Sequence, residues 1–403
     1  MTTTINNEHK KLNVPNLRFP EFQGEWEKKS LGEIGDSFIG LTYKPTDVVS
    51  EGGLIVFRSS NIQNGCMDYK DIVRVNKNVK EKLITKKDDL LVCARNGSAR
   101  LIGKNAILHE ADANQTFGAF MMVFRSDKNH FVHQLLNTRR YTSQVSENLG
   151  ARINQITSSD LSSFEFFFPT ENSEMNKIAA LLDLLDERIV TQSKIIEDLK
   201  KLKSAIIENH YNQTEKQTVS IADLGEPFSV GNLAKDDLTE TGMPCVIYGE
   251  LFTTYGETIS QIESHTNKTT GMILSKKGDL LFPSSTTVDA MSLIAPSVIN
   301  VDGVILGGDM FGIHINHNYN AQYLSYYFNH IAKRQLAKFA KGSTIIHLHY
   351  ADLEKAKLLL PSLKEQNRMA KCLVALDKKV SVEQNLLSSL TCQKSYLLQQ
   401  MFI

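Results

Sequence analysis

The sequence predicts an α+β protein with two similar globular halves, each followed by a long helix, and the two helices paired as a coiled coil. Three observations carry this prediction. Blocks of sequence recur about 190 residues apart along nearly the whole chain. Each half mixes short strands with a helical patch, and each ends in a stretch of 37 residues without proline or glycine. A sustained apolar stripe with charged flanks runs along both stretches.

Composition limits the function classes. A chain of 403 residues is long enough for two domains with separate cores. Its 45 basic and 45 acidic residues cancel, which disfavours a protein that grips nucleic acid by charge alone. The five cysteines form no CxxC pair, so we expect no zinc site, no disulfide framework and a reducing cytoplasm. No membrane span or signal peptide is expected, and residues 1–25 are predicted to be an N-terminal arm.

The internal repeat is the main observation. Residues 34–40 reappear as 224–231, and the Lys-Lys-x-Asp-Leu-Leu block at 86–91 reappears at 276–281, both starting 190 residues later. Further matches follow at shifts of 191 or 192: Gly150 with Gly342, Asp160 with Asp352, Pro169 with Pro361, Asn176 with Asn367, and Asp186 with Asp377. Short Gly/Asp turns recur by chance in many proteins. Four blocks in one register favour a true duplication.

The first part of each repeat is predicted to be a globular domain, at residues 26–170 and 219–361. Strands are expected at 54–57 and 117–124 in the first half, and at 280–282 and 301–315 in the second. Helical patches are expected at 131–149 and 323–339, where apolar residues recur every three or four positions.

The second part of each repeat is a long helix, predicted at 171–211 and 362–403, with a polar linker at 212–218. The pairing stripe comprises Leu185, Ile189, Ile196, Leu199, Leu202 and Ile206 in the first helix, and Leu376, Val380, Leu387, Leu390 and Leu397 in the second. Charges, among them Lys200, Lys201 and Lys203, are expected to lie around it. Each helix could instead pack flat on its own domain, but at about 1.5 Å per residue it would overhang a domain of this size.

Catalytic motifs are absent from the sequence. Residues 97–105 resemble a phosphate loop but place five residues between the glycines and Asn105 after the lysine, where a Walker A loop has four residues and Ser or Thr. No dinucleotide fingerprint and no Asn/Asp-Pro-Pro-Tyr/Phe run is present. His347 and His349 could share one strand face, but a structural or DNA-facing role is favoured over a metal site. Asp198 and Lys200 are interpreted as solvated helix charges rather than a nuclease pair, and Trp26 as core.

The opening run at 14–26, the block at 87–91 and the long helices after Pro169 and Pro361 together resemble the specificity subunit of type I restriction–modification enzymes. The resemblance covers essentially the whole chain. It implies two pseudo-repeated target-recognition domains, each reading one half of a split double-stranded DNA site. It also implies that the two long helices are antiparallel and act as a spacer and as the docking surface for two methyltransferase subunits, with restriction/motor subunits joining them. Catalysis, S-adenosylmethionine, ATP and Mg would then belong to the partners, and this chain would hold no catalytic residue and no metal.

Base-contacting residues do not follow from the resemblance, so we predict them from side-chain chemistry: polar and basic groups on loops can read base edges. In the first half the candidates are Arg58, Ser59, Asn61, Arg95, Asn96, Ser98, Arg100, Arg152, Asn154 and Gln155. In the second half they are Tyr248, Ser284, Ser285, Thr286, Thr287, Lys341, Ser343, Thr344 and His347. Each could equally be an ordinary surface polar group.

Charge divides unevenly between the halves. Residues 26–170 hold 19 basic and 16 acidic side chains, whereas residues 219–361 hold 10 and 14. The second half is therefore a poor autonomous phosphate binder, and we expect partner subunits to supply much of the positive charge. Two other functions stay open at this point. One is a coiled-coil scaffold with two ligand-binding domains and no DNA role, and the other is an enzyme such as a hydrolase with scattered catalytic groups.

Overall fold

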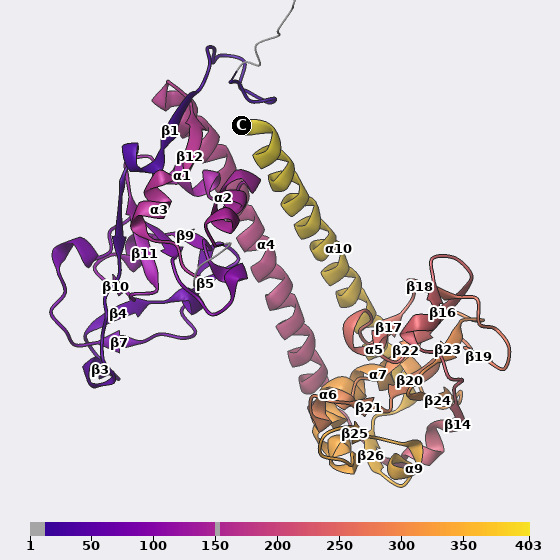
Figure 1. The fold of residues 1–403 in the computed structure, drawn as a ribbon. Helices are drawn as coiled ribbons and strands as arrows, with labels where there is room; N and C mark the ends of the chain where they lie inside the picture. The colour runs from indigo at the N-terminus through magenta and orange to yellow at the C-terminus, as the bar shows by residue number, and fades with distance from the viewer. Residues whose placement is uncertain (1–12, 150–153) are drawn as a thin grey trace, which may run out of the picture. The chain divides into compact units, whose positions relative to one another are not determined.

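The computed structural model describes residues 13–149 and 154–403 and forms two compact units (Figure 1). The first unit contains the described residues up to Gln192 together with Leu386–Ile403, and the second is Ser193–Asn385. Two long helices, α4 (Asn172–Gln213) and α10 (Leu363–Met401), each contribute one segment to each unit. Both units mix strands and helices, which confirms the predicted α+β class.

An antiparallel sheet in the order β2-β11-β8-β9 forms the centre of the first domain. Alternate side chains of a strand point to opposite sides of the sheet, and in the inner strands both sets are apolar. Leu90 and Val92 of β8 join one buried cluster, and Leu91 and Cys93 join another. The strands are β1 Glu27–Ser30, β2 Asp36–Ile39, β3 Val48–Val49, β4 Leu54–Phe57, β5 Ile62–Gln63, β6 Cys66–Met67, β7 Arg74–Val75, β8 Leu90–Cys93, β9 Asn105–Ile107, β10 Thr116–Phe117, β11 Met121–Arg125 and β12 Glu165–Phe168; the helices are α1 Asn129–Leu135, α2 Arg139–Leu149 and α3 Ser158–Ser163.

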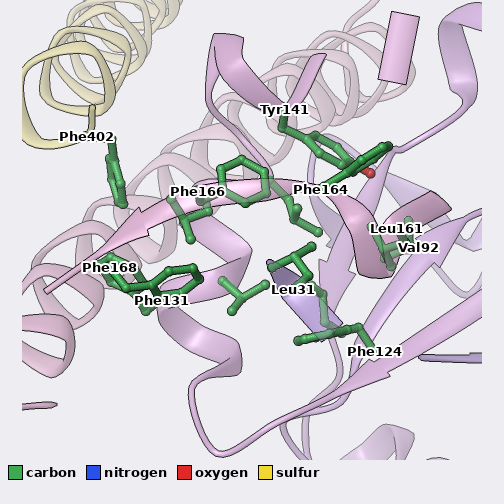
Figure 2. Close-up of a cluster of buried hydrophobic side chains, with 14 of the residues drawn as sticks. Leu31, Val92, Phe124, Phe131, Tyr141, Leu161, Phe164, Phe166, Phe168 and Phe402 are labelled. Carbon is green, nitrogen blue, oxygen red and sulfur yellow. The ribbon is translucent and has the colours of Figure 1, made fainter. Parts of the chain in front are cut away.

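The larger cluster of the first unit is rich in aromatic rings and includes the end of the chain (Figure 2). The ring centroid of Phe402 lies 5.4 Å from that of Phe131 and 6.3 Å from that of Trp26. Trp26 is 2% exposed, so its predicted core position is confirmed. The backbone N–H of Leu17 donates to the carbonyl of Gln400 at 2.9 Å. Residues from both ends of the described chain therefore complete this core.

The second domain repeats this plan with longer strands. Its two five-stranded sheets have the orders β14-β24-β20-β22-β17 and β15-β18-β16-β23-β19. In β20, Leu280 and Phe282 face one cluster and Leu281 faces another. The strands are β13 Gln217–Ser220, β14 Gly225–Ser229, β15 Leu238–Thr239, β16 Met243–Ile247, β17 Thr258–Ile259, β18 Ser264–Thr266, β19 Ile273–Leu274, β20 Asp279–Pro283, β21 Ser285–Thr286, β22 Ser297–Ile299, β23 Ile305–Gly307, β24 Met310–Ile315, β25 Ile346–His347 and β26 Lys357–Leu360; the helices are α5 Glu250–Thr253, α6 Ala290–Leu293, α7 Ala321–Tyr327, α8 Lys333–Leu336 and α9 Tyr350–Leu353.

The duplication extends to individual pairings. Strand β1 pairs with β12 at Glu27↔Phe168, and β13 pairs with β26 at Gln217↔Leu360, so the partners differ by the shifts of 190 and 192 seen in the sequence. The recurring Lys-Lys-x-Asp-Leu-Leu block is a turn before a buried strand. In the first copy an oxygen of Asp89 accepts from the N–H of Lys86 at 2.8 Å, and in the second Asp279 accepts from Lys276 at 2.8 Å. These aspartates satisfy turn backbone groups, which explains why the block recurs without catalytic chemistry.

Several predicted elements are interrupted. The strand expected at 117–124 is two strands, because the chain turns at Gly118–Phe120 between β10 and β11. The stretch 301–315 is likewise divided into β23 and β24. The second helical patch is divided by a single π-helical turn at Phe328–Ala332 between α7 and α8. The predicted linker at 212–218 is largely structured, because α4 continues to Gln213 and β13 begins at Gln217.

The predicted pairing stripe is buried or half-buried at every position except one. Leu185, Ile196, Val380 and Leu390 are buried, and the others are half-buried. Leu202 is the exception at 47% exposed, and Lys203, expected among the flanking charges, is 8% exposed instead. Within the second unit, Lys203 contacts Asp377 and His210 contacts Glu365, so the two helix segments there are antiparallel. No helix within 13–149 and 154–403 is both long and apolar enough to cross a bilayer.

Candidate nucleic-acid interface

Three loops predicted from the first half of the sequence lie together in the first unit. Arg95 forms a backbone bridge with Gln155. The side-chain amide of Asn96 donates to the hydroxyl of Ser59 at 3.0 Å, and that of Asn154 donates to the carbonyl of Gly97 at 3.0 Å. These contacts join residues 58–61, 95–100 and 154–155 into one continuous surface, which we call the first loop surface.

Not every predicted residue of the first loop surface is free to bind. Asn61 is 1% exposed, and both groups of its side-chain amide are hydrogen-bonded within the domain. The oxygen accepts from the N–H of Arg58, and the nitrogen donates to the carbonyls of Asp68 and Asp71. We therefore correct its assignment from base contact to loop scaffold. Asn96 also has a scaffold role, because its oxygen accepts from the N–H of Ser98.

The remaining candidates of the first loop surface differ in their freedom. The Arg58 guanidinium is held by Asp71 at 2.6 Å, and Ser59 and Asn154 take part in the loop contacts already described. Arg95, Ser98 and Arg100 are exposed, and Gln155 is half-buried. Arg152 lies outside the described residues. The groups best placed to meet a ligand are thus Arg95, Ser98 and Arg100.

One residue of this surface, Phe120, is not among those predicted from the sequence. Phe120 is 57% exposed at the turn between β10 and β11, and its carbonyl accepts from the N–H groups of both Ala94 and Arg95. The Arg95 guanidinium lies 5.1 Å from the centroid of its ring. A stacked guanidinium and an exposed ring offer two complementary contacts, one to a guanine edge and one to a thymine methyl group. The sequence signal for this turn is Gly118, which interrupts the apolar run between Phe117 and Phe124.

Burial shifts the pKa values of two further groups beside the first loop surface, Lys104 and Cys93. The Lys104 ammonium donates to the carbonyl of Ser59 at 3.3 Å, and its partial burial lowers its pKa. Burial raises the pKa of the neighbouring Cys93 thiol to about 11, so this thiol stays protonated and unreactive at neutral pH. Lys104 therefore acts as a support for the loop that carries Ser59.

The second unit brings two of its three predicted loops together. Strands β21 and β25 pair at Ser285↔His347, and the N–H of Leu348 donates to the carbonyl of Ser284 at 2.9 Å. Residues 284–287 and 341–347 thus form one surface, the second loop surface. Tyr248 is exposed on a separate loop, where its ring packs against Gly308.

Burial again divides the candidates of the second loop surface. Ser284 and Ser285 are 4% and 8% exposed, so we correct their assignment from base contact to strand pairing. Lys341 is exposed but forms an ion pair with Asp352. The exposed or half-buried polar groups that remain are Thr286, Thr287, Ser343, Thr344 and His347. The His347 and His349 rings stack at 6.0 Å, and within the described residues no group of three potential metal ligands exists.

Replacing Arg95 with Ala is expected to weaken discrimination at one half of a DNA target while leaving the other half unchanged. An arginine bidentate to guanine contributes about 1–3 kcal/mol, roughly 5- to 150-fold. The matched control is Arg140→Ala, because Arg140 also lies 5.1 Å from an aromatic centroid, that of Phe167, but on α2, where its guanidinium donates to the carbonyl of Glu165. The check is competition binding with half-site variants. An equal loss for all DNA sequences would identify Arg95 as a phosphate contact, and no loss would remove it from the interface.

The structure is thus a duplicated α+β fold with one polar loop surface in each copy. The model of one protein family, the type I restriction modification DNA specificity domain, matches the chain twice, at residues 23–201 and 213–391. These matches cover most of the sequence, and the chain belongs to this family.

Individual relatives agree with the family. The specificity subunit of the type I restriction enzyme EcoKI from Escherichia coli is 28% identical over 184 residues, which are 43% of this chain and 39% of that relative. The StySPI specificity subunit from Salmonella potsdam is 27% identical over 195 residues, 45% of this chain and 42% of that relative. Each match spans about two fifths of the relative's length.

Solved structures share the fold. The S subunit of a type I restriction-modification system from M. genitalium has a TM-score of 0.65 at 17% identity, covering 97% of this chain and 99% of that one. A chain from a study of complex assembly and conformational transition in a type I R-M system has a TM-score of 0.50 at 14% identity, covering 93% of this chain and 97% of that one.

Proposed function

We propose that this chain is the specificity subunit of a type I restriction–modification complex and reads a double-stranded DNA target in two separate parts. The observation that carries the proposal is the contrast between matched positions of the two domains. Gly118 in the first domain lies beside the side chain of Arg58, and the matching Gly308 in the second lies beside the ring of Tyr248. A methyl group in place of the glycine hydrogen would be 4.0 Å from Cγ of Arg58 in the first case and 3.0 Å from Cδ1 of Tyr248 in the second. Equivalent positions thus carry arginine in one domain and tyrosine in the other, and this difference in side chains on a shared scaffold supports separate half-site preferences.

The proposed partners are two methyltransferase subunits, docked on the long helices, and restriction/motor subunits. Exposed apolar side chains on these helices support a docking role: Leu184 and Val382 are 61% and 59% exposed. The directed reactions are adenine methylation and ATP-driven cleavage, with S-adenosylmethionine, ATP and Mg bound by the partners and this chain non-catalytic. The complex would work in the cytoplasm, and the five free cysteines are compatible with that compartment.

Purified alone, the chain is expected neither to methylate nor to cut DNA, whereas addition of its partner methyltransferase should methylate a bipartite motif. The measurement is transfer of a labelled methyl group from S-adenosylmethionine, followed by long-read sequencing of the modified DNA. Methyl transfer by the chain free of partner contamination would overturn the non-catalytic assignment. Failure of the combined proteins to bind DNA would instead favour the scaffold without a DNA role.

A further inference from the structure

In each unit, one aspartate of a long helix joins the other long helix and the domain. In the first unit, Asp186 of α4 accepts from the ammonium of Lys394 of α10 at 2.5 Å, and its second oxygen accepts from the amide of Gln134 of α1 at 3.0 Å. We call Asp186, Lys394 and Gln134 the first junction. Each carboxylate oxygen is thereby held by a different element.

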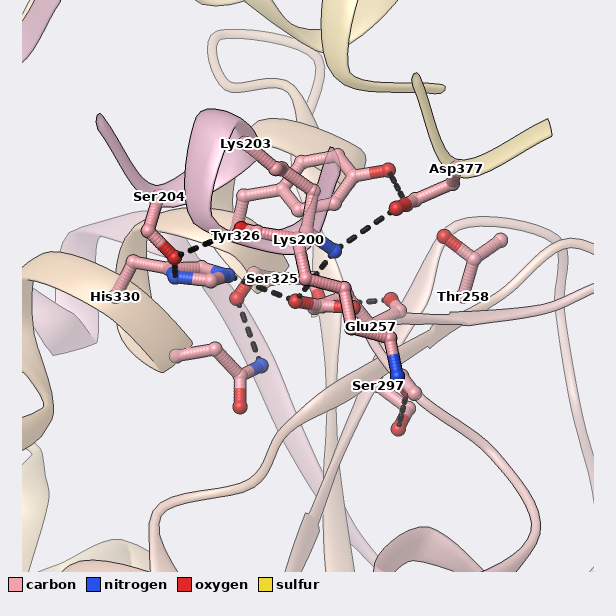
Figure 3. Close-up of polar contacts among 12 residues, drawn as sticks. Lys200, Lys203, Ser204, Glu257, Thr258, Ser297, Ser325, Tyr326, His330 and Asp377 are labelled. Carbon is pink, nitrogen blue, oxygen red and sulfur yellow. Dashed lines mark hydrogen bonds and ion pairs between the residues drawn. The ribbon is translucent and has the colours of Figure 1, made fainter. Parts of the chain in front are cut away.

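The second unit contains the equivalent set with the helices exchanged. Asp377 of α10 accepts from the ammonium of Lys203 of α4 at 2.8 Å, and its other oxygen accepts from the hydroxyl of Tyr326 of α7 (Figure 3). Asp377, Lys203 and Tyr326 form the second junction.

The two junctions are related by the internal repeat. Asp186 and Asp377 are 191 residues apart, Lys203 and Lys394 are also 191 apart, and Gln134 and Tyr326 are 192 apart. Each long helix therefore carries one aspartate and one lysine, and each aspartate meets the lysine of the other helix. The domain residue changes from an amide to a phenol, but in both cases it donates a hydrogen bond. Preservation of this pattern while the side chain changes indicates that the bond itself matters.

Both junctions are partly desolvated, which makes them more directional than surface ion pairs. The side chains of Lys394 and Lys203 are 16% and 10% exposed. A carboxylate held by charge from one side and by a hydrogen bond from another has little freedom to rotate. Three elements are thus fixed at one point, and the angle between the domain and its helix segments depends on that point.

The second junction has an additional charged layer. Glu257 accepts from Lys203 at 3.0 Å and contacts the ring nitrogen of His330 at 2.8 Å (Figure 3). Burial opposes ionisation of Glu257, but the bond from His330 and the charge of Lys203 outweigh it and lower its pKa to about 2. Burial likewise opposes the charge on Lys203, yet the two carboxylates raise its pKa. The ion pair between Lys203 and Glu257 is therefore formed at neutral pH.

We propose that Asp186 and Asp377, through these junctions, are the positioning residues that fix each recognition domain on its helix segments and so restrict the complex to one gap length between the half-sites. The proposal rests on the proposed function. It differs from a role for helix length alone, because it places part of the gap selectivity in the contact between domain and helix.

The test uses the full chain with its partner methyltransferase and substitutions of the domain donor. Gln134→Met also removes a second bond of the same amide, to Asp183 of α4 at 2.8 Å, so Tyr326→Phe is the more specific of the two variants. Tyr326→Phe and Gln134→Met are expected to keep both half-site sequences and to lower the preference for the wild-type gap over gaps one base pair longer or shorter at least tenfold. Tyr323→Phe is the matched control, since Tyr323 is also buried on α7 but lies outside the junction. The preference is measured by competition among duplexes that differ only in gap length, and by the genomic methylation motif.

The proposal would be overturned if both donor variants kept the wild-type preference for one gap length. It would also be overturned if Tyr323→Phe reduced that preference as much as the donor variants do. Should Tyr326→Phe fail to fold by circular dichroism, Asp377→Asn, which keeps the side-chain size, replaces it with the same two outcomes. A wild-type complex that yields no bipartite motif would instead overturn the proposed function, so the two failures are distinguishable.

Discussion

Inserting four residues after Gln192 and four after Asn385 is expected to lengthen the recognised gap by one or two base pairs while both half-site sequences stay the same. These positions are where α4 and α10 pass from one unit to the other, so the pairings within each unit are preserved. Four helical residues add about 6 Å, against about 3.4 Å per base pair of DNA. The leftover rotation of about 40° is close to that of one base pair along the duplex.

Two control insertions make this result specific. Four residues placed in α4 alone should misalign the pairing with α10 and reduce activity. Four residues after Glu215, between α4 and β13, should leave the gap unchanged because they lie outside both helices. The genome-wide methylation motif is the readout. An active double-insertion variant with the wild-type gap would show that partner subunits, rather than the helices, position the two domains.

Lys203→Met is expected to lower the free energy of unfolding by about 3–5 kcal/mol, because it leaves Glu257 and Asp377 facing each other without the cation. The control is Lys201→Met on the same helix. Lys201 is 68% exposed in an ion pair with Glu197 four residues away, and its loss should leave the free energy of unfolding unchanged within error.

Which of the two units Lys203→Met destabilises can also be measured. Trp26 is the single tryptophan and lies in the core of the first unit, whereas Lys203 is in the second. Urea unfolding followed by circular dichroism should therefore shift more than unfolding followed by tryptophan fluorescence. Equal losses for Lys203→Met and Lys201→Met would mean that the buried charges contribute no more than surface ones.

Periodicity and repetition were sufficient to predict the frame of the molecule. The strand at 54–57 has the predicted bounds, and both long helices follow from stripes that the duplication supports. The side-chain roles were harder. Asn61, Ser284 and Ser285 are polar loop residues like their exposed neighbours, and only the folded chain shows that they are buried against backbone groups. Lys203 carries the same charge as Lys201, but it faces acids contributed from 54 and 174 residues away along the chain. Sequence pattern encodes which face of a helix is apolar, and it does not encode which distant carboxylate meets a given lysine.

The position of Phe402 in the first core has a consequence for the order of events during synthesis. Residues up to Gln192 leave the ribosome long before Leu386–Ile403, which belong to the same unit. At about 5–20 residues per second, the intervening stretch takes roughly 10–40 s to make. Throughout that interval the surface later covered by Met401 and Phe402, beside Trp26 and Phe131, is open to solvent. The unit translated first therefore completes its core after the second unit has been made, and the nascent chain must keep an unfinished apolar surface from aggregating until Leu386–Ile403 have been synthesised.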